Sequence, residues 1–237
     1  MEYNVDKFKA GLEKLNITLS EEQIGQFLKY YEMLIEKNKV MNLTAITEYD
    51  EVIEKHFLDS ISLCQVYDLS KPVTILDMGT GAGFPGIPLK IAFPEIEITL
   101  ADSLNKRIKF LDEVIAELGL EKVKTIHARA EELARNKEHR ANYDVVVSRA
   151  VANLSTLGEY CIPFVKEGGC FISYKSGEVE EEVENAKNAI KILGGQIKNI
   201  YKFELSEQKR SFITIEKIKA TPKTYPRKAG TPAKMPL

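Results

Sequence analysis

Apolar residues recur at helical spacing over the first third of the chain. Ser20 and Gln23 form a capping box, which marks the start of a helix. The apolar positions after it step by three and four residues: Ile24, Phe27, Leu28, Tyr31, Leu34 and Ile35. After the turn-like segment NKVMNLTAIT (38–47), residues 48–67 repeat this spacing. We therefore expect residues 1–68 to form a small helical cap.

The pattern changes at Pro72 to short apolar runs that alternate with amphipathic segments. The runs expected to be strands are VTILDM (73–78), EITLAD (97–102), VKTIHA (123–128), YDVVVS (143–148) and GCFISYK (169–175). Helices are expected near 86–93, 103–118, 151–165 and 178–193. This alternation predicts a parallel sheet with helices on both faces. Two further runs, 199–205 and 210–218, are separated only by SEQK, which predicts an antiparallel hairpin.

The segment TILDMGTGAGFPGIPLK (74–90) fits a dinucleotide-binding signature. Gly81, Gly83 and Gly86 spell G-x-G-x-x-G, and Asp102 lies about 20 residues further on, where an acid that binds ribose is expected. In this frame, however, two residues are left over between the end of the strand and the first glycine of the motif. The fit is therefore poor.

The same segment also fits the nucleotide loop of methyltransferases that use S-adenosylmethionine. Asp77, Gly79, Gly81 and Gly83 spell D-x-G-x-G-x-G directly after the apolar strand. In this frame Gly79 and Gly81 let the backbone approach the cofactor, and Asp77 is placed to attract its ammonium group. Together with the hairpin, this frame favours a class I methyltransferase fold over residues 69–219, Rossmann-like, with a mostly parallel seven-stranded sheet and an antiparallel C-terminal hairpin.

Three other strand ends carry candidate cofactor residues, because ligands bind at the carboxyl edge of such a sheet. Asp102 offers two acceptor oxygens to ribose hydroxyls, or it is an exposed turn acid. Ala130 and Glu131 follow the third strand, where adenine usually binds, although Glu131 is equally a first-turn helix acid. Arg149 ends the fourth strand, where the methyl group is passed, or it is a solvated arginine.

The segment SRAVAN (148–153) lacks two kinds of methyl-acceptor machinery. It contains neither the Asn/Asp-Pro-Pro-aromatic motif that receives an exocyclic amine nor the cysteine nucleophile of cytosine-C5 enzymes. The acceptor is then expected to be nucleophilic already, such as guanine N7, whose methylation needs positioning and no general base. In this interpretation Arg149 positions ligands and is not a base.

Charge is distributed unevenly along the chain. The net charge is −2, but residues 217–237 hold six basic side chains and no acidic one, which leaves 27 bases and 35 acids before them. Residues 220–237 are therefore expected to form a basic arm, either for a polyanion such as RNA or as a solubilising tail. No apolar run is long enough for a membrane helix, and three cysteines and three histidines form no metal cluster. We expect a cytoplasmic monomer without metal.

The chain as a whole resembles the glucose-inhibited division protein B family of small-subunit ribosomal RNA methyltransferases. The resemblance rests on MNLTAIT, KHFLDSI, LDMGTGAGFPGIPL, DSLNKRIKFL, ARAEEL, VVSRAVA and YPRKAGTPAKMPL, which follow one another almost from end to end. It implies methyl transfer from S-adenosylmethionine to N7 of one guanine in small-subunit (16S) ribosomal RNA, free or assembled with proteins. By motif position, it implies cofactor contacts at Gly79, Phe84, Ala130, Glu131 and Arg149.

Further residues are candidates for contact with the RNA. His56, Asp59 and Ser60 share one face of a predicted helix, either as a structural hydrogen-bond cluster or as a roof that holds the guanine. Lys175, which ends the fifth strand, and the arm residues Arg227 and Lys228 are candidate phosphate contacts.

Alternative functions remain open at this point. One is a class I methyltransferase that acts at a different RNA site, and another is an oxidoreductase that uses a nicotinamide dinucleotide. A third is a pure RNA-binding module, which would retain RNA but bind no S-adenosylmethionine.

Overall fold

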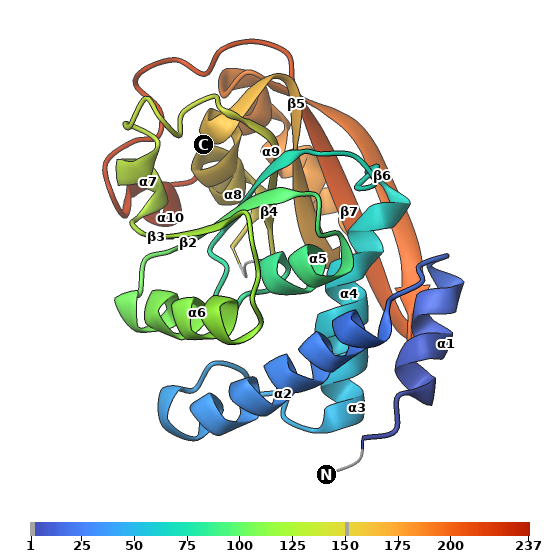
Figure 1. The fold of residues 1–237 in the computed structure, drawn as a ribbon. Coiled ribbons are helices and arrows are strands. Elements are labelled where there is room, and N and C mark those ends of the chain that lie inside the picture. Colours follow the sequence, from blue (N-terminus) through green and yellow to red (C-terminus); the bar gives the residue numbers. More distant parts are fainter. Residues whose placement is uncertain (1–2, 150–151) are drawn as a thin grey trace.

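The centre of the protein is a twisted seven-stranded sheet (Figure 1). The computed structural model describes residues 3–149 and 152–237. The strands are β1 (Thr74–Met78), β2 (Glu97–Asp102), β3 (Val123–His127), β4 (Tyr143–Ser148), β5 (Val165–Ser176), β6 (Gly195–Leu205) and β7 (Gln208–Lys217). Their order is β3-β2-β1-β4-β5-β7-β6, and only β7 pairs antiparallel, with β5 and β6. The expected parallel sheet with a C-terminal hairpin is confirmed.

Helices cover both faces of this sheet. One face packs against α5 (Gly86–Ala92), α6 (Asn105–Glu117) and the N-terminal helices, and the other against α7 (Ala130–Leu133), α8 (Leu154–Cys161) and α9 (Glu180–Ile192) (Figure 1). Because side chains alternate along a strand, Ile75 packs on the first face and Leu76 on the second. The helix expected at 151–165 begins at Leu154, and its predicted first residue lies outside the described residues.

The N-terminal third is helical, as expected. It holds α1 (Asp6–Lys14) and α2 (Glu21–Met41), and the Ser20–Gln23 capping box is formed in both directions. Buried residues of this region, such as Phe27 and Phe57, belong to the same apolar cluster as Ile75 and Ile172 of the sheet. The cap therefore has no separate core, and the sheet and cap are one packed body on this face.

The third long helical stretch is irregular. From Tyr49 to Gln65 the chain passes through α3 (Tyr49–Val52), a π-helix at Ile53–Leu58, α4 (Asp59–Ile61) and a short 3₁₀ turn at Ser62–Gln65. Single π turns are rare and are frequently found at functional sites. This one contains Lys55 and His56, which both line a cavity at the carboxyl edge of the sheet. In the part of the chain that the structure describes, no helix is both long and apolar enough to span a bilayer.

Residues 220–237 do not extend into solvent as the expected arm. They return along α7 and α8 and end in the short helix α10 (Thr231–Lys234) (Figure 1). Arg140 donates hydrogen bonds to the carbonyl oxygens of Thr221 and Tyr225 at 3.0 and 2.9 Å, and Thr156 donates to the Pro232 carbonyl at 3.1 Å. The segment after β7 is therefore part of the folded domain.

Candidate active site

The glycine loop between β1 and α5 has the backbone conformation that the D-x-G-x-G-x-G frame requires. Gly79, Gly81 and Gly83 have φ angles of 75°, 64° and 107°, values that residues with a Cβ rarely adopt. Gly86 plays a different part, because a Cβ there would lie 2.2 Å from Leu100 Cδ2. It lets the start of α5 pack closely on β2.

Asp77 is buried beneath this loop and lines neither cavity at the sheet edge. Its Oδ2 accepts hydrogen bonds from Thr80 Oγ1 at 2.7 Å and from Gly86 N at 2.9 Å. Burial raises the pKa of Asp77 to about 7. The expectation that Asp77 faces the cofactor ammonium is therefore corrected: its carboxyl group holds the loop in shape.

Asp102, at the end of β2, faces the smaller of the two cavities but is already well bonded. Its Oδ2 accepts from Gly81 N at 3.0 Å and Arg107 Nη1 at 3.2 Å, and its Oδ1 accepts from Leu104 N at 2.9 Å. A carboxylate has about four acceptor positions. Asp102 can therefore receive one ribose hydroxyl directly, and two only if one of these donors is displaced.

Two cavities meet at the carboxyl edge of the sheet, and Gly79 and Ala152 line both of them. The smaller, of about 410 Å³, is lined by residues from the ends of β1, β2, β3 and β4, from α7 and α8, and from the C-terminal segment. They include Asp102, Ala130 and Glu131. The larger, of about 850 Å³, is lined by residues of the cap, the glycine loop and β5, with His56 and Phe84 among them. An elongated ligand laid across Gly79 reaches into both.

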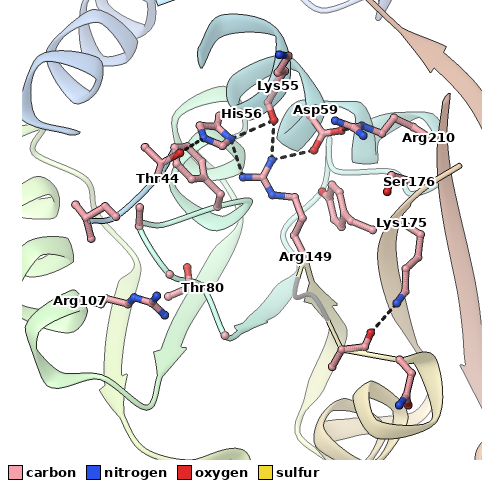
Figure 2. A pocket seen from close by; sticks show the side chains of 18 of the residues that line it. Thr44, Lys55, His56, Asp59, Thr80, Arg107, Arg149, Lys175, Ser176 and Arg210 are labelled. Carbon is pink, nitrogen blue, oxygen red and sulfur yellow. Dashed lines mark hydrogen bonds and ion pairs between the residues drawn. The ribbon is translucent and has the colours of Figure 1, made fainter. Parts of the chain in front are cut away.

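Arg149 stands at the centre of the larger cavity (Figure 2). Its Nη1 donates to the carbonyl oxygen of Lys55 at 3.1 Å and to Asp59 Oδ2 at 2.8 Å, and its Nη2 lies 3.2 Å from His56 Nδ1. Its guanidinium carbon lies 5.0 Å from the centre of the Phe84 ring, a cation–π contact. The π turn matters here, because it presents both the Lys55 carbonyl and the His56 ring to one guanidinium.

His56 is held as a neutral ring. It stacks on Phe84 with 4.4 Å between ring centres, and its Nε2 lies 2.8 Å from Thr44 Oγ1. Nδ1 lies 3.2 Å from Arg149 Nη2 and 3.1 Å from the Lys55 carbonyl oxygen, so it faces both a donor and an acceptor. Burial and the Arg149 charge lower the pKa of His56 to about 3. Both ring nitrogens are occupied, and neither is free to act as a base.

Asp59 joins two arginines at the wall of this cavity. Its Oδ1 accepts from Arg210 Nε at 2.8 Å, opposite the bond that its Oδ2 receives from Arg149. Its neighbour Ser60 is buried and donates within the helix to the His56 carbonyl at 2.5 Å. Of the three residues that share the predicted helix face, His56 and Asp59 thus reach the cavity, and Ser60 does not.

The larger cavity carries an excess of positive charge. Its lining includes five basic side chains, Lys55, Arg107, Arg149, Lys175 and Arg210, and two acidic ones, Asp59 and Glu182. Lys175, expected at an RNA phosphate, donates to Glu182 Oε1 at 2.7 Å and to the Ala152 carbonyl at 2.8 Å. Of the residues described, no group of three His, Cys, Asp or Glu side chains lies close enough to hold a metal ion.

The structure separates the two arm residues expected to bind RNA. Arg227 is paired with Glu159 of α8, whose side chain is 1% exposed, through bonds of 2.7 to 3.1 Å from its Nη2 and Nε. Its guanidinium is therefore used within the fold, which corrects the expectation of a free phosphate contact. Lys228 is exposed, and its role stays a prediction.

Thr44 and Arg210 are among the residues of the larger cavity that were not singled out from the sequence. Thr44 lies in the quoted motif MNLTAIT, and its Oγ1 lies 2.8 Å from His56 Nε2. Arg210 lies in the hairpin strand β7, 151 residues from Asp59, and no local pattern marks it. Only the antiparallel pairing of β7 with β5 brings it to the cavity.

Residues 23–213 match the GidB family, described as rRNA small subunit methyltransferase G. The chain belongs to this family. The GidB resemblance drawn from the sequence motifs is thereby confirmed.

Relatives over nearly the full length carry the same name, ribosomal RNA small subunit methyltransferase G. One from Lachnoclostridium phytofermentans is 55% identical and covers 97% of this chain and 96% of its own. One from Bacillus cereus (strain B4264) is 50% identical over 99% of both chains. The GidB assignment therefore applies to the cap, the sheet and the C-terminal segment alike.

Solved structures of more distant proteins share the fold of this GidB chain. TYW2 from M. jannaschii, solved in complex with AdoMet, has a TM-score of 0.54 at 17% identity and covers 68% of this chain and 77% of its own. TrmN from Thermus thermophilus has a TM-score of 0.54 at 16% identity, covering 68% of this chain and 48% of its own. The class I methyltransferase fold expected from the sequence is confirmed.

Proposed function

We propose that the protein transfers a methyl group from S-adenosylmethionine to N7 of one guanine in small-subunit ribosomal RNA. The observation that carries the proposal is the pair of cavities that meet at Gly79, the smaller one lined from the strand ends and the larger one rich in positive charge. Relatives of 50 to 55% identity are named for the methylation of this RNA.

The two cavities fit the two ends of the cofactor. The smaller one offers the nucleoside an unused acceptor position on Asp102 and apolar contacts from Met78 and Leu157. The left-handed glycines at 79 and 81 leave the backbone open to close approach. Arg149, at the end of β4 in the larger cavity, is the cation assigned to the carboxylate of the methionine end. When bound, S-adenosylmethionine supplies an electrophilic methyl group at the junction of the two cavities.

The larger cavity suits a nucleotide of the RNA. Five basic side chains against two acidic ones give its walls a net positive charge at neutral pH. Phosphate contacts of this kind position a nucleic acid without specifying its sequence. The stacked rings of His56 and Phe84 add a flat surface at the same cavity for a base or for the cofactor.

The side chains around Arg149 favour transfer without a general base. Guanine N7 attacks with its own lone pair, so no proton has to leave before the methyl group arrives. Among the described residues lining the larger cavity, the two natural candidates are already occupied: Asp59 by two arginines, and His56 by Arg149 and Thr44. Arg149 then acts by orienting ligands and by electrostatics.

The test is a methylation assay on small ribosomal subunits, and on their free RNA, taken from cells that lack the enzyme. With labelled S-adenosylmethionine we expect one labelled N7-methylguanosine per RNA, identified by mass spectrometry of the digested nucleosides. Label in another nucleoside would point to a different RNA site, and no label in either substrate would contradict the proposal.

The Arg149→Lys variant tests the role of Arg149 in the same assay. Lysine keeps the charge but cannot reach the Lys55 carbonyl, Asp59 and His56 together. Loss of a preorganised donor costs roughly 10²–10³ in rate. We expect a single-turnover rate lower by about this factor. A rate equal to that of the wild-type enzyme would contradict the assigned role.

A further inference from the structure

The segment after β7 forms part of the wall of the smaller cavity. Gly230 and Ala233 line this cavity together with Ala130 and Glu131 of α7 and with Tyr160 of α8. In Figure 1, α10 lies beside α7 and α8, below the loop that carries the chain back from β7. The wall is thus made by residues far apart in sequence and close in space.

Buried contacts anchor this segment on both sides of the cavity. Before it, the Arg227 backbone N–H donates to Glu159 Oε1 at 2.6 Å, in addition to the guanidinium bonds to the same carboxylate. Beyond Gly230, Thr156 Oγ1 donates to the Pro232 carbonyl at 3.1 Å, and the Pro232 ring is buried. The stretch between the two anchors is therefore held in one place relative to α8.

The segment also fixes a side chain that the family motifs place at the cofactor. The backbone N–H of Gly230 donates to Glu131 Oε1 at 2.9 Å, and Glu131 is 6% exposed. Gly230 has φ 80°, in the left-handed region, which turns its N–H toward α7. One carboxylate oxygen of Glu131 is thus directed by the C-terminal segment.

We propose that residues 225–234 form a wall of the nucleoside subsite of the cofactor, and that Gly230 is a positioning residue that acts through Glu131. This inference rests on the proposed function, because it names the ligand of the smaller cavity. It also gives the basic segment a role other than RNA binding. The Arg227 charge is paired with Glu159, and the backbone of the segment and α10 enclose the cofactor.

A truncation after Ala229 distinguishes the contribution of the cavity wall from that of the positive charge of the segment. It removes Gly230 and Ala233 from the cavity but keeps the Glu159–Arg227 anchor, and Lys234 is the one basic residue lost. Lys234→Gln is the matched control, because it removes the same charge and leaves the wall intact. Binding of S-adenosylhomocysteine and of 5′-methylthioadenosine, which lacks the amino-acid end, is measured by calorimetry.

We expect the truncation to weaken binding of both ligands by about tenfold or more, because small-molecule sites enclose most of the ligand surface. Lys234→Gln should bind both like the wild-type protein. Unchanged affinity of a folded truncated protein would overturn the inference. A loss of affinity confined to S-adenosylhomocysteine would also overturn it, because the effect would then lie at the amino-acid end of the ligand. If the wild-type protein itself bound neither ligand, the proposed function would fail instead.

Ala233→Leu provides a second route that leaves the chain length unchanged. Ala233 is exposed and lines the smaller cavity, so a larger side chain there fills ligand space without disturbing the core. We expect a similar loss of affinity for both ligands, with a thermal midpoint close to that of the wild-type protein. Unchanged affinity for 5′-methylthioadenosine in this variant would also overturn the inference.

Discussion

His56 and Phe84 are stacked beneath the guanidinium of Arg149, and each residue limits what the others can do. Burial and the positive charge of Arg149, whose guanidinium lies beside the ring, both oppose protonation of His56. The imidazole is therefore a neutral ring held in one position. Thr44, on the far side of the ring, completes this arrangement by binding Nε2.

The depressed pKa of His56 predicts a pH dependence of stability. The folded ring gains its proton only near pH 3, whereas an unfolded histidine gains it near 6.5. The unfolded state therefore binds more protons between these values, and the free energy of unfolding falls as pH drops through this window. Asp77, with its pKa raised to about 7, has the opposite effect on the pH dependence of stability. It is present in the wild-type protein and in a His56 variant alike, so its effect cancels in a comparison of the two.

His56→Gln isolates this effect, because glutamine has a donor and an acceptor and does not titrate. Urea unfolding from pH 7 to pH 4.5 should show the wild-type protein losing more stability than the variant. The difference should grow to about 2.5 kcal/mol, at about 1.4 kcal/mol per pH unit at most. Single-turnover methylation should show no acidic limb due to His56 between about pH 6 and 9, since neither N7 nor His56 titrates there. Equal pH slopes of the two proteins would contradict a buried neutral ring.

At the scale of elements, the glycine loop has a left-handed backbone conformation that requires glycine residues. Gly79→Val places a β-branched side chain at φ 75° beside both cavities, and Gly168→Val places one at φ 82° in β5, where a Cβ meets open space. Each should lose about 1–2 kcal/mol of stability from the left-handed backbone. Only the variant at Gly79 should lose affinity for S-adenosylmethionine, as measured by calorimetry. A similar loss from Gly168→Val would mean that the effect is general destabilisation.

Elements whose pattern is local could be predicted from the sequence. The capping box at Ser20, the alternating strands and the hairpin all follow from periods of 3.6 and 2 along the chain. The π turn at 53–58 could not be predicted, because its apolar spacing looks like that of an ordinary helix. Arg210 was missed for a related reason: its partner Asp59 is determined by strand pairing and not by neighbouring residues.

Charge was the least reliable guide to contacts. The six basic residues after Lys217 suggested a free arm, but a count of charges does not show which of them have partners in the fold. Glu159, a buried acid on α8, is that partner for Arg227. Asp77 gave the opposite error, since its place in the glycine motif suggested a ligand contact although its carboxyl group is fully buried.

At the scale of the whole molecule, the Glu159–Arg227 pair fastens the C-terminal segment to the domain. Arg227→Gln leaves a buried carboxylate without its cation, so the free energy of unfolding should fall by about 3 kcal/mol or more. The salt dependence of RNA binding should hardly change, because this guanidinium is already neutralised. Chemical unfolding and RNA titration at several salt concentrations measure the two effects.

Lys223→Gln is the matched control for this prediction. Lys223 is exposed in the same segment, so its loss should leave stability within about 0.5 kcal/mol. If it contacts a phosphate of single-stranded RNA, the salt slope should flatten by about 0.7. A reversed result, in which only Arg227→Gln flattens the salt dependence of RNA binding and stability is unchanged, would mean that the segment is a free RNA-binding arm.

The Asp59 carboxylate has a consequence for the order of folding. It joins residues that lie 90 and 151 positions away, at Arg149 and Arg210. Contacts over such separations require long loops to close, which slows folding. Until residues 49–65 dock against Arg149 and Arg210, the glycine loop lacks one wall of the larger cavity. During refolding, methyl transfer should therefore return later than secondary structure.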